Sequence, residues 1–294
     1  MHKVHITFLG PKGTYSHLAL HKYANNYFNT FIESTCGNFY LILKKVESGQ
    51  ADYAIVPIEN SSSGSIKEIY ELLARTELYI IGEIILPIEH CMLVYPNTHL
   101  HHIETIYSHA QPFQQCSLFM QHFPTCQLKY TLSTAAAMTQ VASLQSPKVA
   151  AIGSEEGGQY YNLQVIARNI SNQRPNHTRF IILSKEAQEV DSETPAKTTL
   201  FLSHKKTSRC LIHPLLILRR QNIISHLLSR YANKRLWEDF FYLDLKNHLT
   251  TPIMQHYLIK IKYFSRSMRI LGCYPRDKQD EWLPDKLPIR KKIQ

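Results

Sequence analysis

Short apolar runs alternate with polar loops and with amphipathic stretches along the first two thirds of the chain. Runs rich in Val, Ile, Leu and Phe between turn residues are typical of buried strands, and the stretches between them repeat apolar residues at helical spacing. This alternation predicts an α/β protein with mostly parallel sheets. The expected strands cover residues 4–9, 53–58, 78–86, 90–95, 106–107, 149–152 and 180–183, and the expected helices cover residues 16–27, 39–48, 66–75, 111–123 and 133–144.

A polar stretch at residues 184–194 precedes a second, smaller unit. Its strands and helices follow the order βαββαβ, which predicts a ferredoxin-like fold. The remaining chain is charged and contains prolines, so we expect a tail there. The expected strands of this unit cover residues 198–203, 225–229, 240–245 and 268–274, and its helices cover residues 214–220 and 252–263. The expected parts of the chain are residues 1–190, 191–275 and 276–294.

Composition narrows the class of protein without identifying it. A chain of 294 residues with 44% hydrophobic content has enough apolar residues to bury a core. No apolar run approaches the roughly 18 residues of a membrane helix, so we expect no membrane partner. Because Met1 leads directly into an expected strand, we expect no signal peptide. The six cysteines include no CxxC pair, which favours reduced thiols and a cytoplasmic location.

The formal net charge of +10 resides in the C-terminal part of the chain. Residues 1–190 hold 13 Lys/Arg and 14 Asp/Glu, whereas residues 191–294 hold 20 Lys/Arg and 9 Asp/Glu. A nucleic-acid role is one interpretation of the basic excess. The basic residues are not interleaved with stacking aromatics, however, which favours a diverged, solubilised domain without a nucleic-acid partner.

Sixteen histidines raise the question of a metal site. The densest group, His99, His101 and His102, lies in a loop flanked by Pro and Asn. No cysteine or carboxylate stands near this group at a metal-ligand spacing, which favours a solvated loop. We therefore expect neither a metal ion nor a cofactor.

Five polar clusters follow expected strands in residues 1–190. Loops that leave the carboxyl ends of parallel strands meet at one edge of a sheet, which is where ligands bind. Asn, Ser, Thr, Gln and Arg dominate these clusters, and none contains a nucleotide motif or a Ser-His-Asp order. Such a pocket suits an anionic small molecule that is polarised without a cofactor. The clusters are residues 10–16, 59–65, 108–116, 133–137 and 176–180.

Two of these clusters also have plain structural explanations. Residues 10–16 offer N–H groups and hydroxyls to an anion at a helix start, with Ser16 as the cap, but an ordinary strand-to-helix turn explains them equally well. Residues 133–137 present a helix N-terminus that alanines leave open, although simple capping by Ser133 or Thr134 is slightly favoured.

The last cluster, residues 176–180, leads from a polar loop straight into an apolar strand. Thr178 beside Arg179 at a strand start provides groups that hold an oxyanion and hand over a proton. Alone, the pair is equally typical of a strand entry with a solvated arginine. The four polar clusters that precede it favour the functional interpretation.

Taken together, these segments resemble prephenate dehydratase in order and spacing. The resemblance covers residues 4–275 and is greatest to the dehydratase and regulatory portion of bifunctional chorismate mutase–prephenate dehydratase. We expect no mutase segment, because Met1 stands three residues before the first expected strand. The matching segments are residues 8–17, 56–61, 107–109, 114–116, 133–136 and 176–180, followed by residues 237–238, 241–244, 266–268 and 271–275 of the regulatory ACT domain.

The resemblance implies a two-lobed catalytic domain of the periplasmic-binding-protein type, followed by the ACT domain. The reaction it implies converts prephenate, a dianion, to phenylpyruvate, water and carbon dioxide. Thr178 would donate a hydrogen bond to the leaving hydroxyl, and Asn60, Ser108 and Gln115 would orient the substrate. Arg179 would hold a carboxylate or brace the loop. Phe180 would pack the strand start. The residues expected to bind substrate are Gly10, Lys12, Gly13, Thr14, Glu59, Ser61, Ser133 and Thr134.

The regulatory segment departs from the family pattern at the positions implied to bind L-phenylalanine. The family's Gly-Ala-Leu turn is Arg209, Cys210 and Leu211 here, and its Glu-Ser-Arg-Pro strand retains only Ser229 and Arg230. Glycine permits a close approach of backbone and ligand that arginine does not. We therefore expect weakened feedback by phenylalanine.

Three functions remain open from the sequence. The first is a prephenate dehydratase, which the intact Thr178–Arg179 pair favours. The second is an arogenate dehydratase, and the third is a protein that binds a small carboxylate without turnover. The resemblance also implies a homodimer or a higher even oligomer. The family often carries Asp where Asn172 stands, which leaves open what partners Arg179.

Overall fold

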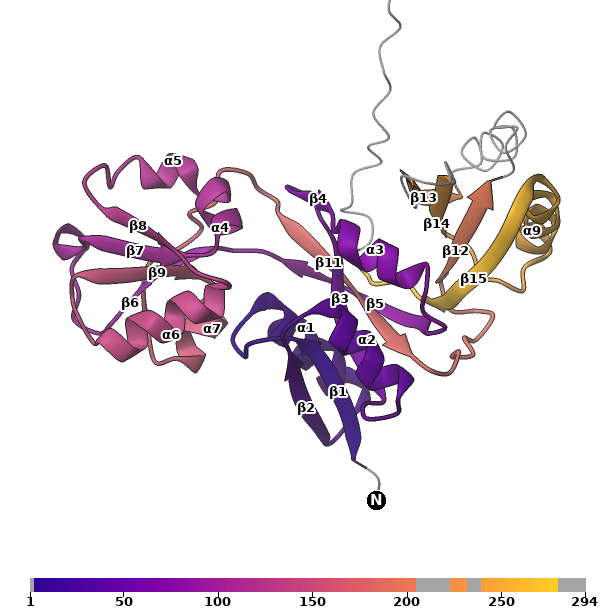
Figure 1. Cartoon of the computed structure of the whole chain (residues 1–294), viewed down its shortest axis with the longest axis horizontal. Coiled ribbons are helices and arrows are strands. Elements are labelled where there is room, and N and C mark those ends of the chain that lie inside the picture. The colour runs from indigo at the N-terminus through magenta and orange to yellow at the C-terminus, as the bar shows by residue number, and fades with distance from the viewer. Residues whose placement is uncertain (1–2, 205–222, 232–238, 280–294) are drawn as a thin grey trace, which may run out of the picture. The chain divides into compact units, whose positions relative to one another are not determined.

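The computed structural model describes residues 3–204, 223–231 and 239–279 and has a mixed α/β fold (Figure 1). The chain forms two compact units. One unit comprises residues 1–66 and 84–180, and the other comprises residues 67–83 and 181–294. In the described part of the chain, no helix is both long enough and apolar enough to cross a bilayer.

The first sheet has the strand order β2-β1-β3-β11-β5, and the short β4 pairs with β3. Strand β1 runs parallel to both β2 and β3, and helices α1 and α2 pack against β1 and β3. The boundary between the two units falls inside β5 and β11. The elements are β1 (Val4–Leu9), α1 (Tyr15–Tyr27), β2 (Phe31–Cys36), α2 (Phe39–Glu47), β3 (Tyr53–Asn60), β4 (Gly64–Ser65), β5 (Tyr79–Pro87) and β11 (His177–Ser184).

The second sheet lies wholly in the first unit, in the order β10-β6-β9-β7-β8. Strand β7 is parallel to β8 and β9, whereas β6 is antiparallel to β9 and β10, so the sheet is mixed. The elements are β6 (Cys91–Val94), a 3-10 turn (Leu100–His102), β7 (Thr105–Ser108), α4 (Ala110–Gln115), α5 (Ser117–Met120), β8 (Gln127–Tyr130), α6 (Thr134–Leu144), β9 (Val149–Gly153), α7 (Glu155–Tyr160) and β10 (Gln164–Ala167).

Strand alternation gives the second sheet two cores. Leu93 and Ala151 pack with Met138 of α6 on one face, whereas Met92 and Ile152 belong to a separate core with Phe113 of α4 on the other. Figure 1 accordingly shows helices above and below this sheet. The arrangement places the start of α4 and the start of α6 at strand ends, where the polar clusters of the sequence lie.

Several expected elements differ from the observed ones. The helix expected at residues 111–123 is two short helices, α4 and α5, separated by Cys116. Helix α1 begins at Tyr15 with Thr14 as its N-cap, so the expectation of Ser16 as the cap is wrong. Strands β2, β8 and β10 and helix α7 were not anticipated from the sequence. All four residues of β8 are exposed, which removes the apolar alternation that would have indicated a strand.

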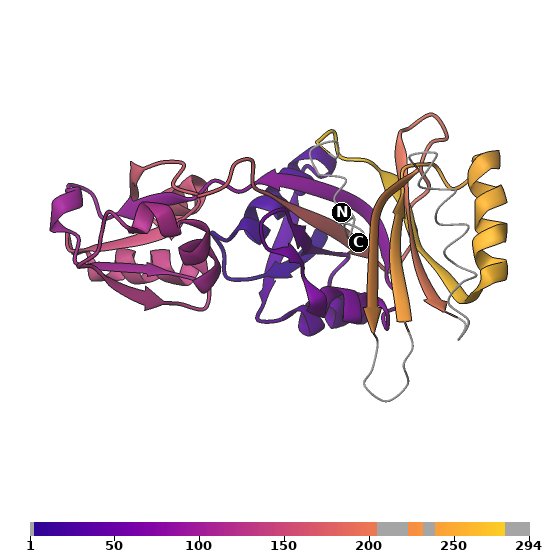
Figure 2. The same cartoon turned by 90° about the horizontal axis from the view of Figure 1, so that it is seen from above.

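The third sheet belongs to the second unit and has the order β13-β14-β12-β15, with antiparallel neighbours. Helix α9 lies along one face, as Figure 2 shows, and buries Leu258 and Ile261 against Leu200 and Leu243. The expected helix at residues 214–220 lies outside the described residues. The elements are α3 (Lys67–Leu73), β12 (Ala196–His204), β13 (Ile224–Tyr231), β14 (Asp239–Leu245), α9 (Pro252–Phe264) and β15 (Ser265–Pro275).

Residues 67–83 join the second unit although they precede most of the first unit in the sequence. The ring of Tyr70 in α3 meets the ring of Tyr242 in β14, with centroids 4.8 Å apart. Lys197 Nζ in β12 lies 2.9 Å from both carboxylate oxygens of Glu83. The side chains of this ion pair are 1% and 0% exposed. The second unit is therefore tied to this early segment by a buried charge pair as well as by apolar packing.

Candidate active site

Neutral polar side chains line a cavity of about 310 Å³ in the first unit. The cavity lies where β3 ends, where β11 begins and where α4 and α6 start. None of the described residues that line it is Lys, Arg, Asp or Glu. Its polar lining includes Thr14, Tyr15, Asn60, His90, His109, Gln115, Ser133, Thr134 and Thr178.

Asn60, the last residue of β3, is the centre of the hydrogen-bond network. Its side-chain oxygen accepts hydrogen bonds from the backbone N–H groups of Ser62 and Ser63, both at 3.0 Å. Its Nδ2 lies 2.9 Å from Asn176 Oδ1 and 2.9 Å from Thr178 Oγ1. Asn60 is only 5% exposed, so it fixes the positions of its neighbours from within the protein.

The hydroxyl of Thr178 is arranged as a donor toward the cavity. Because Asn60 Nδ2 is a donor, Thr178 Oγ1 accepts in their 2.9 Å hydrogen bond. No other hydrogen bond occupies the Thr178 hydroxyl among the residues that the structure describes. Its hydrogen is therefore available to a ligand.

The N-terminus of α6 provides a second source of positive potential. Ser133 is its N-cap and accepts a hydrogen bond from Ala136 N at 3.0 Å, as the capping interpretation predicted. Ser133 and Thr134 also line the cavity, so the helix start faces it. The N-terminus of an eleven-residue helix attracts anions through its dipole and its unpaired N–H groups.

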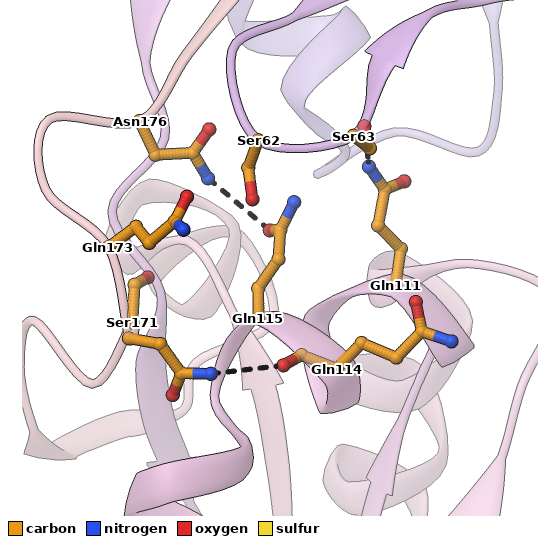
Figure 3. A pocket seen from close by; sticks show the side chains of 9 residues that line it. Ser62, Ser63, Gln111, Gln114, Gln115, Ser171, Gln173 and Asn176 are labelled. Atoms are coloured by element: carbon orange, nitrogen blue, oxygen red, sulfur yellow. Dashed lines mark hydrogen bonds between the residues drawn. The ribbon is translucent and has the colours of Figure 1, made fainter. Parts of the chain in front are cut away.

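A second polar chamber of about 230 Å³ shares Ser63, Gln111 and Gln115 with the cavity. Figure 3 shows its lining of amides and hydroxyls. Gln111 Nε2 donates to Ser63 Oγ at 2.6 Å, and Asn176 Nδ2 donates to Gln115 Oε1 at 3.3 Å. These bonds join α4 to the loops that follow β3 and precede β11.

The comparison with known proteins decides the family. A model of the prephenate dehydratase family matches residues 6–188. The chain belongs to the prephenate dehydratase family. The bifunctional chorismate mutase/prephenate dehydratase of Enterobacter agglomerans is 52% identical over 277 residues, which are 94% of this chain and 72% of that protein. The resemblance drawn from the sequence motifs is thereby confirmed, and the chain is an enzyme of the hydro-lyase class.

Solved structures share the fold, and one of them is a prephenate dehydratase. The prephenate dehydratase of Arthrobacter aurescens in complex with L-Phe is 28% identical, with a TM-score of 0.81 over 93% of this chain and 90% of that one. GqqA, described as a novel type of quorum quenching acylase, is 25% identical, with a TM-score of 0.82 over 93% of this chain and 98% of that one. Both likenesses extend well beyond the residues that match the family model.

The structure brings about half of the expected dehydratase site together. Asn60, Gln115, Thr178 and Phe180 line the cavity, as do Thr14, Ser133 and Thr134. The other expected residues lie outside the cavity lining, namely Gly10, Lys12, Gly13, Glu59, Ser61, Ser108 and Arg179.

Ser108 was expected to orient the substrate, and Arg179 was expected to hold a carboxylate or to brace the loop. Both side chains are fully buried. Ser108 Oγ donates to Ile152 O at 3.2 Å and so ties β7 to β9. Arg179 alternates with Thr178 and Phe180 along β11, and those two neighbours line the cavity. Arg179 therefore lies on the opposite face of β11 from Thr178 and Phe180, which favours the bracing role of the two that were expected.

Asn172 has a structural role of its own. Its Oδ1 accepts from Leu118 N at 3.0 Å, and its Nδ2 donates to Ser117 Oγ at 2.8 Å and to Gln114 O at 3.2 Å. These bonds secure the start of α5. Asn172 is thus committed to this helix start and is not available as a partner for Arg179.

The loop of residues 10–16 offers less to an anion than the sequence suggested. Gly13 N donates to His17 Nδ1 at 3.1 Å, so this N–H group is already used. Thr14 Oγ1 donates to Pro11 O at 3.0 Å. Ser61, in the next cluster, accepts from His177 N at 2.9 Å and ties the end of β3 to the start of β11. Gly13 and Ser61 support the cavity walls from behind, whereas Thr14 lies in the lining itself.

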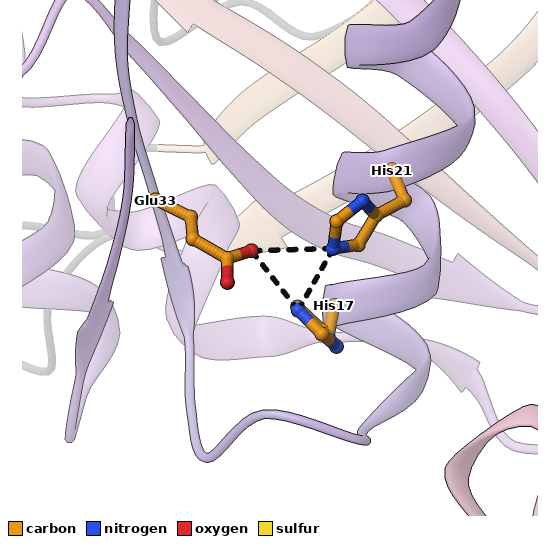
Figure 4. Close-up of side chains that lie close together, drawn as sticks. All are labelled: His17, His21 and Glu33. Atoms are coloured by element: carbon orange, nitrogen blue, oxygen red, sulfur yellow. Dashed lines mark hydrogen bonds and ion pairs between the residues drawn. The ribbon is translucent and has the colours of Figure 1, made fainter. Parts of the chain in front are cut away.

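His17, His21 and Glu33 lie together behind this loop (Figure 4), with ligand-type atoms within 4.8 Å of one another. His17 Nε2 is 3.0 Å from Glu33 Oε2, and Lys12 pairs with the other oxygen of Glu33. Because Gly13 N–H donates to His17 Nδ1, a neutral His17 carries its hydrogen on Nε2, the atom that a metal ion would need. The cluster is therefore better suited to share protons than to bind a metal.

Sequence reasoning missed three functional-site candidates, Tyr15, His90 and His109, which all line the cavity. Tyr15 and His109 lie inside two of the polar clusters, residues 10–16 and 108–116. Their position next to expected site residues could have indicated that they belong to the site. His90 was expected to be the first residue of the strand at residues 90–95. Nothing in the sequence around it indicates a functional residue. Burial lowers the pKa of His90 and of His109 below the ordinary value.

The buried histidines predict that acid destabilises the protein. Burial lowers the pKa of His17, His90, His109 and His177 from the ordinary 6.5, so the folded state takes up these protons less readily than the unfolded chain. Their contribution is full above pH ~6.5 and is lost as the pH falls through the lowered folded values. We expect the free energy of unfolding in urea to decrease from about pH 7.5 to about pH 5.5. The variant His90→Gln should show a shallower decrease, and equal slopes would contradict this account.

Proposed function

We propose that the cavity binds prephenate and that Thr178 donates a hydrogen bond to the departing ring hydroxyl. The observation that carries this proposal is the 2.9 Å bond from Asn60 Nδ2 to Thr178 Oγ1, which leaves the threonine hydrogen for the substrate. As the bond from the ring to its carboxylate breaks, carbon dioxide leaves and its electron pair enters the ring. The ring C–O bond breaks, and the oxygen departs as water.

Thr178 stabilises this departure without supplying the proton itself. A threonine hydroxyl is too weak an acid to give up its proton, and the proton that completes the water molecule comes from solvent. A hydrogen bond that strengthens as charge develops on the leaving oxygen lowers the barrier. Decarboxylation supplies the driving force, so the site needs donors placed in advance rather than a strong acid.

The remaining residues have orienting roles in this proposal. Asn60 holds the Thr178 hydroxyl, and Gln115 directs an amide toward the substrate. The start of α6, at Ser133 and Thr134, receives one carboxylate through its dipole and N–H groups. One carboxylate of the dianion has to leave as neutral carbon dioxide. A neutral lining suits this step, because a lysine or arginine bound to that carboxylate would oppose its departure. Arg179 braces β11 from its buried face.

The proposal is tested by adding prephenate to the pure protein and following the ultraviolet absorbance of phenylpyruvate. A second reaction with arogenate, followed as formation of phenylalanine, distinguishes the two dehydratase substrates. Calorimetry with prephenate in the same buffer provides the third arm. Binding without phenylpyruvate formation would reject the catalytic proposal and favour a carboxylate-binding protein.

We further propose a two-lobed catalytic domain of the periplasmic-binding-protein type in residues 1–190, an ACT domain in residues 191–275 and a tail from residue 276. The family match to residues 6–188 supports the first boundary. The strand order β13-β14-β12-β15 supports a ferredoxin-like βαββαβ unit. The described cysteines are all free, which supports a reducing compartment such as the cytoplasm.

Weak inhibition by L-phenylalanine is expected. The Arthrobacter aurescens relative is described in complex with L-Phe, but the chain departs from the family at the implied effector positions. Arg209, Cys210 and Leu211 lie outside the described residues, as do the side chains of Ser229 and Arg230, so this expectation rests on the sequence. An effector acts only through its preference for one conformational state. Loss of one polar contact costs about 1–3 kcal/mol, which is a factor of about 5 to 150 in affinity.

Phenylalanine is titrated against the initial rate, with calorimetry on the same sample. Half-inhibition at tens of micromolar, with one tight site per chain, would contradict weakened feedback. Inhibition only at much higher concentration would agree with it.

A homodimer or a higher even oligomer is also expected. Strands β13 and β15 are the edges of the third sheet, and exposed edges pair readily with a second chain. Ile259 and Tyr263 of α9 are 70% and 75% exposed and add apolar surface to the same unit. Light scattering at micromolar concentration measures the mass directly, and a monomer would contradict the expectation.

A further inference from the structure

The side-chain amides around Asn60 have only one consistent orientation. Ser62 N–H and Ser63 N–H both donate to the Asn60 side chain, and a backbone N–H group has no alternative role. The atom they contact must therefore be the oxygen of Asn60. Its NH2 group then faces Asn176 and Thr178, so Asn176 has to present its oxygen at 2.9 Å.

This orientation is passed on from Asn176 to the far wall of the cavity. With its oxygen bound to Asn60, Asn176 turns its NH2 group to Gln115, as Figure 3 shows, and donates to Oε1 at 3.3 Å. The same oxygen of Gln115 lies 2.8 Å from His90 Nε2. An amide oxygen only accepts hydrogen bonds, so His90 Nε2 carries the hydrogen.

The last member of the series is Tyr15. A neutral His90 with its hydrogen on Nε2 has a lone pair on Nδ1. The Tyr15 hydroxyl lies 2.9 Å from Nδ1 and 3.0 Å from Glu89 O. Both of these atoms accept, so the one hydrogen of the hydroxyl is shared between the imidazole and the backbone carbonyl. His90 is only 2% exposed, and burial lowers its pKa, which keeps the ring neutral. Burial raises the pKa of Tyr15, which keeps its hydroxyl protonated.

The series leaves the NH2 group of Gln115 on the cavity side. Among the described residues, this nitrogen has one hydrogen bond, a long one of 3.4 Å to Asn60 Oδ1. At least one of its two hydrogens is available to a ligand in the cavity that Gln115 lines. If the amide were reversed, an oxygen would face the carboxylates of a dianion and repel them.

We propose that His90 and Tyr15 are positioning residues of the dehydration reaction, which hold Gln115 with its NH2 group toward the substrate. The inference rests on the proposed function, because Gln115 meets the substrate in this cavity. Without the Tyr15 hydroxyl, His90 is free to place its hydrogen on Nδ1 and to accept at Nε2. Gln115 Oε1 then loses its 2.8 Å hydrogen bond from His90 and retains the longer one from Asn176, so its amide is held less firmly and its NH2 group attracts the substrate less.

A double-mutant cycle on kcat/KM for prephenate tests this coupling. Tyr15→Phe alone should lower kcat/KM about tenfold, and Gln115→Ala alone about 10²-fold. In the Gln115→Ala background, Tyr15→Phe should have almost no further effect, because the amide it orients is gone. Multiplication of the two effects, to about a thousandfold, would show that Tyr15 acts independently and would overturn the proposal.

A pair of variants at His90 provides a rescue test. His90→Gln keeps an N–H donor near the position of Nε2, whereas His90→Phe keeps the ring size and removes both nitrogens. The proposal expects His90→Gln to remain within a few-fold of the parent and His90→Phe to lose about tenfold or more in kcat/KM. Equal losses in two folded variants would count against a role through hydrogen bonding.

Two controls keep the outcomes distinct. Turnover of prephenate by the parent chain is measured first, and its absence rejects the proposed function rather than the positioning role. Circular dichroism checks the folding of each variant. If His90→Phe does not fold, the cycle at positions 15 and 115 still decides the proposal, since it leaves His90 in place.

Discussion

The variant Thr178→Ala is expected to turn over prephenate about 10²-fold more slowly than the parent chain, or slower still. The change removes the one hydroxyl hydrogen that Asn60 leaves available in the cavity. A hydrogen bond that forms most strongly in the transition state affects kcat more than KM, so the loss should appear mainly in kcat. Initial rates of phenylpyruvate formation over a range of prephenate concentrations measure both constants.

Two further substitutions at the same position separate chemistry from packing. Thr178→Ser keeps the hydroxyl and should retain most of the activity. Thr178→Val keeps the shape of the side chain but not the donor. Its turnover of prephenate should be as low as that of Thr178→Ala. Turnover by Thr178→Val within a few-fold of the parent would show that the hydroxyl has no part in the reaction.

The second large effect is on stability. Lys197→Met should lower the free energy of unfolding by about 3–5 kcal/mol, because it leaves the carboxylate of Glu83 buried without its ammonium partner. Glu83 would retain the backbone N–H of Asp277, which lies 3.3 Å from Oε1. A hydrogen bond from a neutral backbone group does not replace the attraction of a full charge. Urea denaturation followed by circular dichroism measures the loss.

The double variant Glu83→Leu/Lys197→Met is the matched control for this prediction. Replacing both charges with apolar side chains leaves no unpaired charge, so stability should return to near the parent value or exceed it. A loss in the double variant as large as in Lys197→Met would show that packing, and not the unpaired carboxylate, accounts for the effect. A loss below about 1 kcal/mol in Lys197→Met would show that water reaches Glu83.

The fold was predictable from the sequence where strands are buried on both faces. Residues 53–58 and 149–152 are continuous apolar runs, and residues 4–9 are apolar apart from His5 and Thr7. The structure forms β3, β9 and β1 there and buries most of their residues. Strands β2 and β8 lie at sheet edges and carry polar side chains, so the sequence offers no apolar period there. The break between α4 and α5 depends on Asn172, whose bonds to the start of α5 come from a loop far along the chain.

The site was predictable where a polar residue directly ends or begins a buried strand. Asn60 and Thr178 were found in this way, and the structure joins them by a hydrogen bond. Ser108 also ends a strand, but its side chain is buried and bonds to the neighbouring strand β9. Which face of a sheet a side chain occupies depends on the strand register, which the sequence does not specify. His90 could not be found, since its partners Gln115 and Tyr15 lie 25 and 75 residues away.

The pair of Glu83 and Lys197 has a consequence for how the chain is made. The two residues are separated by 114 positions, so a ribosome exposes the carboxylate on the order of ten seconds before the ammonium that neutralises it. During that interval the segment of residues 67–83 lacks the contacts that it makes with β12 and β14 in the finished protein, while all strands of the sheet of β6 to β10 are already present in the nascent chain. The sheet of β6 to β10 can therefore form first, whereas residues 67–83 reach their final contacts only after β12 has been synthesised. A chain released early would keep that segment exposed, and exposed segments are preferred sites of proteolysis, so an incomplete enzyme is open to removal.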